Sequence, residues 1–227
     1  MTFELEHIFN SYEKNGKIYY GGSQMLSPDK MFRKCGCGIV AAADLFLYLH
    51  RYHKGCRCSM FDCFKEEIIS VDKFLPLYKS LRSYFTLIPH LGISGIMLAL
   101  GINAFFLHNK YPYYARWGVL PSRLWSSIEE MLRQDIPVLI TVGPDFPRIW
   151  EKHSTNMYSD SAAGHSRSTK VRAHFMTLPA LDEEWMHVSS WGKKYRISRD
   201  EYEFHMKHHA SAVSSNIVYI SRLEKAP

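Results

Sequence analysis

The apolar residues in the first half of the chain follow helical spacing. The most hydrophobic segment covers residues 38–53, where apolar side chains surround most of the helix axis. A helix of that kind is buried in the middle of a domain, and Gly55 follows it in the position of a C-terminal cap. The same spacing predicts further helices over residues 71–84, 91–101 and 122–134.

The second half of the chain shows strand patterns instead. Residues 136–142 predict a buried strand, with Pro137 at its entry, where a missing donor costs little. Three more strand-like runs follow, at 174–178, 185–190 and 215–220. Helices first and antiparallel strands last predict an α+β fold, in which a buried helix packs on a C-terminal antiparallel sheet. We expect a single domain over 1–227, with a helical half at about 30–135 and a sheet half at about 136–227.

Two segments interrupt this order. Residues 102–106, which follow Gly101, predict a short strand between two helices. Residues 143–173 form a long polar stretch, and a loop of that length in a compact domain is usually functional or disordered. We therefore expect residues 143–173 to lie over a cleft and to be mobile.

Composition and charge narrow the class of protein. The chain has 227 residues, of which 46% are hydrophobic and 22% are charged, as in an ordinary globular protein. The formal net charge is +6, but the 28 lysines and arginines are scattered and form no basic block. The sequence therefore argues against nucleic-acid binding as the main role. Nothing in it indicates the oligomeric state.

Targeting signals and cysteine usage favour a cytoplasmic protein. The N-terminus lacks the basic and apolar segments of a signal peptide. No apolar run approaches the roughly 18 residues of a membrane span. The five cysteines are an odd number, which fits free thiols in a reducing compartment better than a disulfide framework.

Cys37 is the strongest candidate for a nucleophile. It stands at the start of the buried helix, where the positive end of the helix dipole favours a thiolate. Arg33 and Lys34 precede it and add positive charge. Cys35 shares the same turn and is an alternative nucleophile, although it lies further from the helix.

A thiolate nucleophile needs an imidazole as general base and acid, and a group that orients the imidazole. The chain contains 12 histidines, so position must select among them. His174 begins a strand directly after the long polar stretch, where its side chain can face a cleft. His187 lies inside a strand, whereas His205, His208 and His209 cluster on an expected surface helix.

These residues resemble the motifs of the papain-like cysteine peptidases, and in particular the bacterial double-glycine leader peptidases, the C39-like group. The sequence Cys37-Gly38-Ile39-Val40-Ala41-Ala42 is similar to the start of their catalytic helix. His174-Phe175-Met176-Thr177-Leu178 resembles the strand that carries the family's histidine. Val188-Ser189-Ser190-Trp191-Gly192 resembles the later Asn-Ser-Trp-Gly segment, whose asparagine orients the imidazole. The resemblance covers roughly residues 24–200.

The resemblance also shows departures from the family pattern. The orienting asparagine or aspartate falls on Ser189, whose hydroxyl can accept the imidazole N–H but carries no charge. Asp182 is the fallback for this role. The oxyanion-hole glutamine of the family falls on Met31, and Gln24 stands too early for a plain match. The backbone N–H of Cys37 is available for an oxyanion.

The resemblance implies a thiol-dependent hydrolase that cleaves a peptide or amide bond. Cys37 would be the nucleophile, His174 the base and Ser189 the orienting residue, with no cofactor and no metal. The expected partner is a peptide or protein substrate, which leader peptidases cut after small residues. An acyltransferase or an amidase would use the same residues.

A non-catalytic protein is the alternative from a different class. A degenerate papain-like fold could bind a peptide without cleaving it, and the uncharged Ser189 favours that option. A zinc-stabilised interaction domain could instead use the cysteines as ligands: Cys35, Cys37, Cys56, Cys58 and Cys63. Two cysteines separated by a single residue are, however, closely spaced for ligands of one zinc ion.

Overall fold

The computed structural model describes residues 1–88, 92–148, 150–161 and 164–223. A large antiparallel sheet forms one half of the molecule, with strand order β5-β12-β6-β9-β10-β11-β7-β8 among these residues. Its strands are β5 (Tyr113–Trp117), β6 (Val138–Val142), β7 (Thr155–Ser161), β8 (Gly164–Val171), β9 (His174–Leu181), β10 (Trp185–Ser190), β11 (Lys193–Ser198) and β12 (Ile217–Arg222). The short β1 (Phe3–Glu4) also pairs with β9. This arrangement confirms the predicted α+β class.

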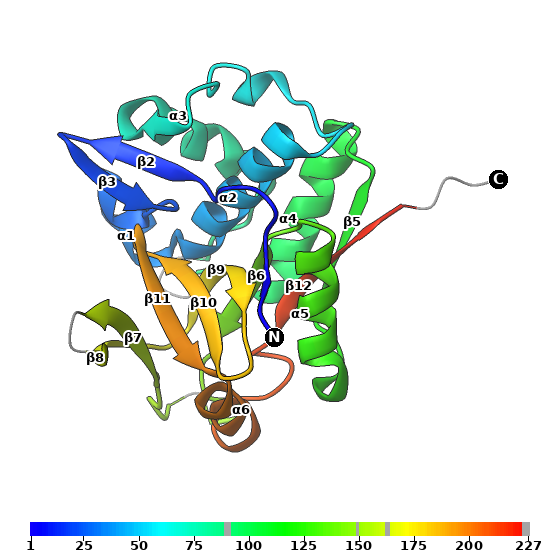
Figure 1. The fold of residues 1–227 in the computed structure, drawn as a ribbon. Helices are drawn as coiled ribbons and strands as arrows, with labels where there is room; N and C mark the ends of the chain where they lie inside the picture. The colour runs from blue at the N-terminus through cyan, green and yellow to red at the C-terminus, as the bar shows by residue number, and fades with distance from the viewer. Residues whose placement is uncertain (89–91, 149, 162–163, 224–227) are drawn as a thin grey trace.

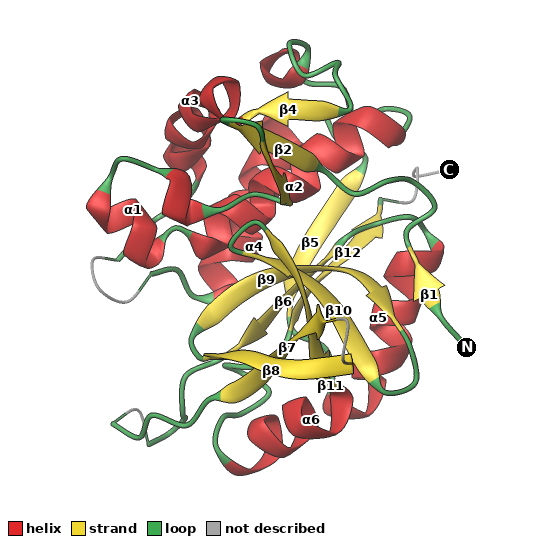
Figure 2. Ribbon diagram, turned by 60° about the vertical axis from the view of Figure 1, so that its left-hand side comes forward, coloured by secondary structure: helices red, strands yellow, loops and turns green. Residues whose placement is uncertain are grey.

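The other half is mainly helical. Its helices are α1 (Lys30–Cys35), α2 (Cys37–Tyr52), α3 (Val71–Leu81) and α4 (Gly95–His108). A small sheet of β2 (Ser11–Lys14), β3 (Lys17–Tyr20) and β4 (Ile68–Ser70) lies beside them. Figure 1 shows α1, α2 and α3 above the strands β9–β11, and Figure 2 shows α6 (Arg199–His208) at the opposite end of the molecule. Helix α5 (Leu124–Arg133) contacts β12 and β1. No described helix has both the length and the apolar character needed to cross a membrane.

Helix α2 lies in the core, as its apolar pattern predicts. It packs on β9 and against α3 and α4, and most of its side chains are buried. The ring of Phe46 stacks on that of Phe105 from α4, with centroids 3.8 Å apart. Gly38 allows the start of α2 to approach its neighbours closely, because a Cβ there would lie 2.6 Å from Ile93 and 3.5 Å from Phe175. The N-terminus of α2 is thereby fixed against the sheet.

The predicted strand at 102–106 is wrong, because these residues belong to α4. Ile102, Phe105 and Phe106 are buried at the i, i+3, i+4 spacing of a helix, and both phenylalanines contact Phe46 of α2. Gly101 lies inside the helix and does not end it. A Cβ at Gly101 would lie 2.3 Å from the ring of Phe85, so a close approach of two segments requires this glycine.

The polar stretch 143–173 also differs from the expected loop. About half of it forms the hairpin of β7 and β8, which extends the sheet beyond β11 through the pair Arg196–Tyr158. The carboxylate of Asp145 is fully buried and binds His153 at 2.6 Å and Arg172 at 3.3 Å. None of the described residues of this stretch lines the cavity that contains Cys37.

Candidate functional site

Cys37 is the first residue of α2, and this half-buried residue lines a narrow cavity between α2 and the sheet. Gly36 separates α2 from α1, so Cys35 ends a different helix and is buried outside this cavity. The structure therefore brings Cys37, and not Cys35, to the other candidate residues. The N–H of Cys37 belongs to the first turn of α2, where N–H groups have no partner within the helix.

The electrostatic environment of Cys37 differs from the expected one. Burial raises the pKa of the Cys37 thiol, although the backbone N–H groups of Phe175 and Gly38 act in the opposite direction. Arg33 and Lys34, the two cations that precede Cys37 in the chain, do not line its cavity. Arg33 donates to the carbonyl oxygens of Ser27 and Pro28, and Lys34 is exposed on α1. The resting form of Cys37 at neutral pH is the thiol.

His174 lines the same cavity as Cys37. It is the first residue of β9, and only 7% of its surface is exposed. Burial lowers the pKa of His174 to about 4, so its imidazole is neutral at neutral pH. The ring of Trp191 covers the imidazole, with centroids 4.6 Å apart and planes tilted by 30°.

Ser190, and not Ser189, is the residue beside the imidazole. His174 Nε2 lies 2.8 Å from Ser190 Oγ, whereas Ser189 Oγ donates to the carbonyl oxygen of Tyr20 at 2.8 Å. The difference has a structural cause, because the pairing of β10 with β9 shifts register between His187 and Ser189. The fallback candidate Asp182 is 2.7 Å from His187 Nε2.

Gln24 belongs to the candidate site, although its position in the sequence is too early for a plain match to the family pattern. It is buried and lines the cavity of Cys37 and His174. Gln24 begins the 3-10 turn η1 (Gln24–Leu26), and helix α1 follows before Cys37, so the spacing differs from the family pattern. The one sequence signal is the Gly21-Gly22 pair just before it, which allows the backbone to pass close to other elements.

The cavity itself is small. It has a volume of about 10 Å³, roughly the room that one water molecule needs. Its lining residues come from the segment before α1, from α2 and from the β9–β10 region: Gly22, Gln24, Cys37, Val40, Ala41, Asp44, His174, Phe175, Met176, Thr177, Ser189, Ser190 and Trp191. A thiol, an imidazole, a hydroxyl and an amide therefore converge on one narrow space, an arrangement suited to nucleophilic attack on a carbonyl carbon.

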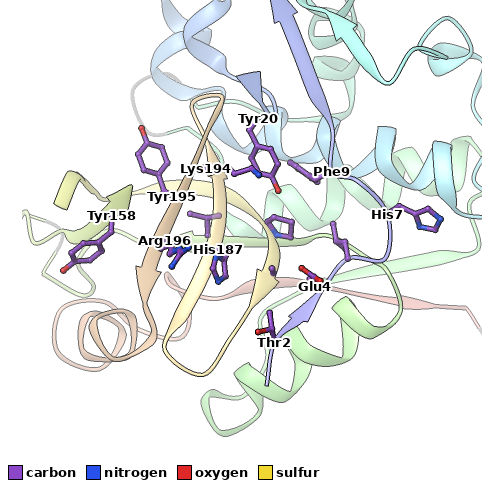
Figure 3. A pocket seen from close by; sticks show the side chains of 14 residues that line it. Thr2, Glu4, His7, Phe9, Tyr20, Tyr158, His187, Lys194, Tyr195 and Arg196 are labelled. Carbon is purple, nitrogen blue, oxygen red and sulfur yellow. The ribbon is translucent and has the colours of Figure 1, made fainter. Parts of the chain in front are cut away.

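A wider cavity of about 280 Å³ lies elsewhere, between β1 and the β10–β11 hairpin (Figure 3). Glu4, Lys194 and Arg196 are among its lining residues, and neither Cys37 nor His174 reaches it. The Tyr20 side chain forms part of its wall, with Lys194 Nζ 4.5 Å from the centre of the ring. We place the candidate active site at the smaller cavity, because that cavity holds the reactive groups.

The remaining cysteines do not gather into a metal site. Cys56 and Cys58 are buried, Cys63 is exposed, and all three are free thiols. Two groups of potential metal ligands occur among the described residues, and neither contains a cysteine: Asp145, His153 and His209, and Glu6, His7 and Asp135. In both groups the carboxylate already has a partner outside the group, since Asp145 binds Arg172 and Asp135 accepts the Tyr48 hydroxyl.

The fold is shared with a known structure. A crystal structure of a protein from Bacillus anthracis, provisionally assigned as a C39-like peptidase, matches with a TM-score of 0.52 and 12% sequence identity. The match covers 99% of this chain and 100% of the other. No family model matches the sequence, and no curated protein matches it. The expected papain-like α+β fold is confirmed, and at this low identity the likeness shows the fold alone.

Proposed function

We propose that the protein is a thiol-dependent hydrolase that cleaves a peptide or amide bond. The observation that carries this proposal is that Cys37 and His174 line the same cavity. In that cavity, Ser190 Oγ is hydrogen-bonded to Nε2 of the imidazole. Because Nε2 is engaged, Nδ1 is the ring nitrogen left to exchange a proton with the thiol. The fold likeness to a provisionally assigned peptidase supports the same class of reaction.

The reaction begins from a neutral pair. Burial raises the pKa of the Cys37 thiol and lowers that of His174, so proton transfer accompanies the attack. Sγ forms a bond to the carbonyl carbon of the substrate while Nδ1 of His174 takes the thiol proton. The N–H of Cys37 and the side-chain amide of Gln24 would stabilise the oxyanion.

Collapse of the tetrahedral intermediate breaks the carbon–nitrogen bond. The imidazolium gives its proton to the leaving amine, and a thioester remains on Cys37. His174 then removes a proton from water, the hydroxide oxygen attacks the thioester, and the thiol leaves with that proton. The narrow cavity favours small side chains next to the cleaved bond, as in the group that the sequence resembles.

Peptide cleavage and thiol labelling test this proposal together. The wild-type protein is incubated with a pool of unstructured peptides, and the products are identified by mass spectrometry. We expect cleavage that Cys37→Ala abolishes and His174→Ala reduces by at least about a hundredfold. Iodoacetamide labelling is then measured site by site, with the exposed Cys63 as an internal control. His174→Ala should slow the labelling of Cys37 at neutral pH and leave that of Cys63 unchanged.

The possible outcomes separate the classes of function. Hydroxamate products with added hydroxylamine, and no hydrolysis products in its absence, would point to acyl transfer through the same thioester. If the wild-type protein binds peptides but leaves them intact, and His174→Ala does not change the labelling of Cys37, a peptide-binding module replaces the hydrolase.

A further inference from the structure

A short piece of chain connects the two halves of the candidate site. We call residues 20–24 the bridging segment, because they run from the end of β3 to Gln24 between α2 and the β10–β11 hairpin. On the sheet side, the Tyr20 N–H donates to Gly192 at 2.9 Å, and Ser189 donates to the Tyr20 carbonyl at 2.8 Å. On the helix side, the Gly22 N–H donates to Asp44 Oδ2 at 2.8 Å. The position of Gln24 in the cavity depends on these contacts.

The two glycines of the bridging segment fit tightly against both sides. A Cβ at Gly22 would lie 2.7 Å from Val40 of α2 and 2.7 Å from the Tyr78 hydroxyl. Gly21 has a φ of +71°, and a Cβ there would lie 2.0 Å from Ser189 Oγ. The backbone of the segment is therefore in direct contact with the helix that carries Cys37 and with the strand that carries Ser190.

Asp44 is the residue of α2 that holds the bridging segment. It lies two turns after Cys37 on the same side of the helix, lines the same cavity, and is 2% exposed. Besides the Gly22 N–H, its carboxylate accepts the Tyr12 hydroxyl at 2.6 Å. Its main-chain oxygen accepts from Asn10 at 2.7 Å, and the Asn10 carbonyl accepts the Gly21 N–H at 2.9 Å.

The Asp44 carboxylate is bound by neutral hydrogen-bond donors. Among the described residues, no lysine, arginine or histidine lies within ion-pair distance of its carboxylate, and all its hydrogen-bond donors are neutral. Burying a carboxylate in this way costs free energy that a neutral side chain would avoid. An ionisable group that lines the cavity of the candidate nucleophile is a candidate for a functional role.

We propose that Asp44 is a positioning residue, whose ionised carboxylate fixes the bridging segment and so holds Gln24 beside Cys37. Protonation of Asp44 removes the negative charge that strengthens the hydrogen bonds from the Gly22 N–H and the Tyr12 hydroxyl. A proton on Oδ2 would face the Gly22 N–H and break that bond, whereas a proton on Oδ1 can be accepted by the Tyr12 hydroxyl. In either case α2 holds the bridging segment more weakly, and Gln24 is less firmly fixed. This inference rests on the proposed hydrolase function for its effect on catalysis.

Among the described titratable groups that face Asp44 or line the cavity, Asp44 is the one whose pKa lies near 6. Tyr12 from β2, Tyr20 from β3 and Tyr78 from α3 face it, and burial raises the pKa of all three phenols. Within the cavity, burial raises the pKa of the Cys37 thiol and lowers the pKa of His174 to about 4. Burial raises the pKa of Asp44 to about 6, against the opposing hydrogen bonds from Tyr12 and Gly22. Positioning should therefore be lost as the pH falls through 6.

The test compares Asp44→Asn with a matched control. Asp135 is also buried and also accepts a tyrosine hydroxyl and a backbone N–H, from Tyr48 and Glu6, but it lies outside the cavity. We expect kcat/KM of the wild type to fall tenfold per pH unit below about 6. In Asp44→Asn, kcat/KM at pH 8 should be at least about tenfold lower, and its decline should move toward the pKa of His174. Asp135→Asn should keep the wild-type profile.

A second readout does not depend on catalysis. The amide resonance of Gly22 in the full-length protein should titrate with a midpoint near pH 6. Tyr12→Phe should move that midpoint upward, because the lost hydrogen bond stabilises the ionised form. A Gly22 amide that does not titrate between pH 4 and 8, or an unchanged kcat/KM profile in Asp44→Asn, overturns the role of Asp44. A titrating Gly22 amide in a protein without hydrolase activity would overturn the proposed function and leave the contact of Asp44 with the bridging segment intact.

Discussion

The imidazole of His174 is held by a neutral hydroxyl in a buried position. An ionised partner would stabilise the imidazolium, whereas the Ser190 hydroxyl contributes one hydrogen bond of about 1 kcal/mol. Trp191 covers the ring and keeps water away from it. In the proposed reaction, the site would therefore rely on orientation and exclusion of water more than on a preformed ion pair.

Substitution of the two neighbouring serines tests which one orients the histidine. Ser190→Ala should lower kcat about tenfold to a hundredfold, because the imidazole loses its only hydrogen bond among the described residues. It should also shift the ring nitrogen resonances of His174. Ser189→Ala removes a contact to the Tyr20 carbonyl and should leave those resonances in place. The opposite pattern, with Ser189→Ala alone shifting them, would return the orienting role to Ser189.

Some of the site could be predicted from the sequence because it depends on local features. The positions of Cys37 at the start of an apolar helix and of His174 at the start of a strand could both be predicted from the pattern of the neighbouring residues. Ser190 could not be chosen over Ser189, because the register shift in β10 depends on how it pairs with β9. Gln24 could not be identified by spacing, because an additional helix stands between it and Cys37.

Among the helices and strands, too, features that follow from the local sequence pattern could be predicted, whereas features that depend on tertiary contacts could not. Helix α2 was predictable because its apolar side chains surround the axis. The strand expected at 102–106 was wrong because a glycine in a helix resembles a helix end when its neighbours are unknown. The β7–β8 hairpin gave no strand signal, because its sequence is mostly polar and most of its described side chains are exposed or half-buried.

Gly101 provides a test of the packing of α4. At an exposed position inside a helix, Gly→Ala raises the free energy of unfolding by about 1 kcal/mol, because alanine has the higher helix propensity. At Gly101 a new Cβ would lie 2.3 Å from the Phe85 ring and 2.7 Å from the Tyr84 carbonyl oxygen, so we expect a net loss of about 1–3 kcal/mol. Urea unfolding measures the change. Ala104→Gly, at an exposed position of the same helix, should cost about 1 kcal/mol from propensity alone. A stabilised Gly101→Ala protein would contradict the packing at Phe85.

At the scale of the whole molecule, the buried ionisable groups predict how stability depends on pH. Burial lowers the pKa of His50, His174 and His205, so their stabilising contribution is complete above their unfolded pKa near 6.5. That contribution is lost as the pH falls through their lowered values. Asp44 has the opposite sign, because its pKa is raised to about 6 and protonation favours the folded state. Its contribution grows as the pH falls from 6 toward 3.8.

The free energy of unfolding of two variants, measured at pH 8, 6 and 4.5, separates these opposing contributions. The wild type should become less stable between pH 6.5 and 4, because several histidines oppose one aspartate. His174→Asn should show a flatter decline, since the difference between pKa values of about 6.5 and about 4 corresponds to at most about 3 kcal/mol. Asp44→Asn should show a steeper decline, because it lacks the group that gains stability in acid. A steeper decline in His174→Asn, or a flatter one in Asp44→Asn, would mean that the burial of these two side chains differs from the structure. Since both line one cavity, the two slopes together report whether that cavity is closed to water in solution.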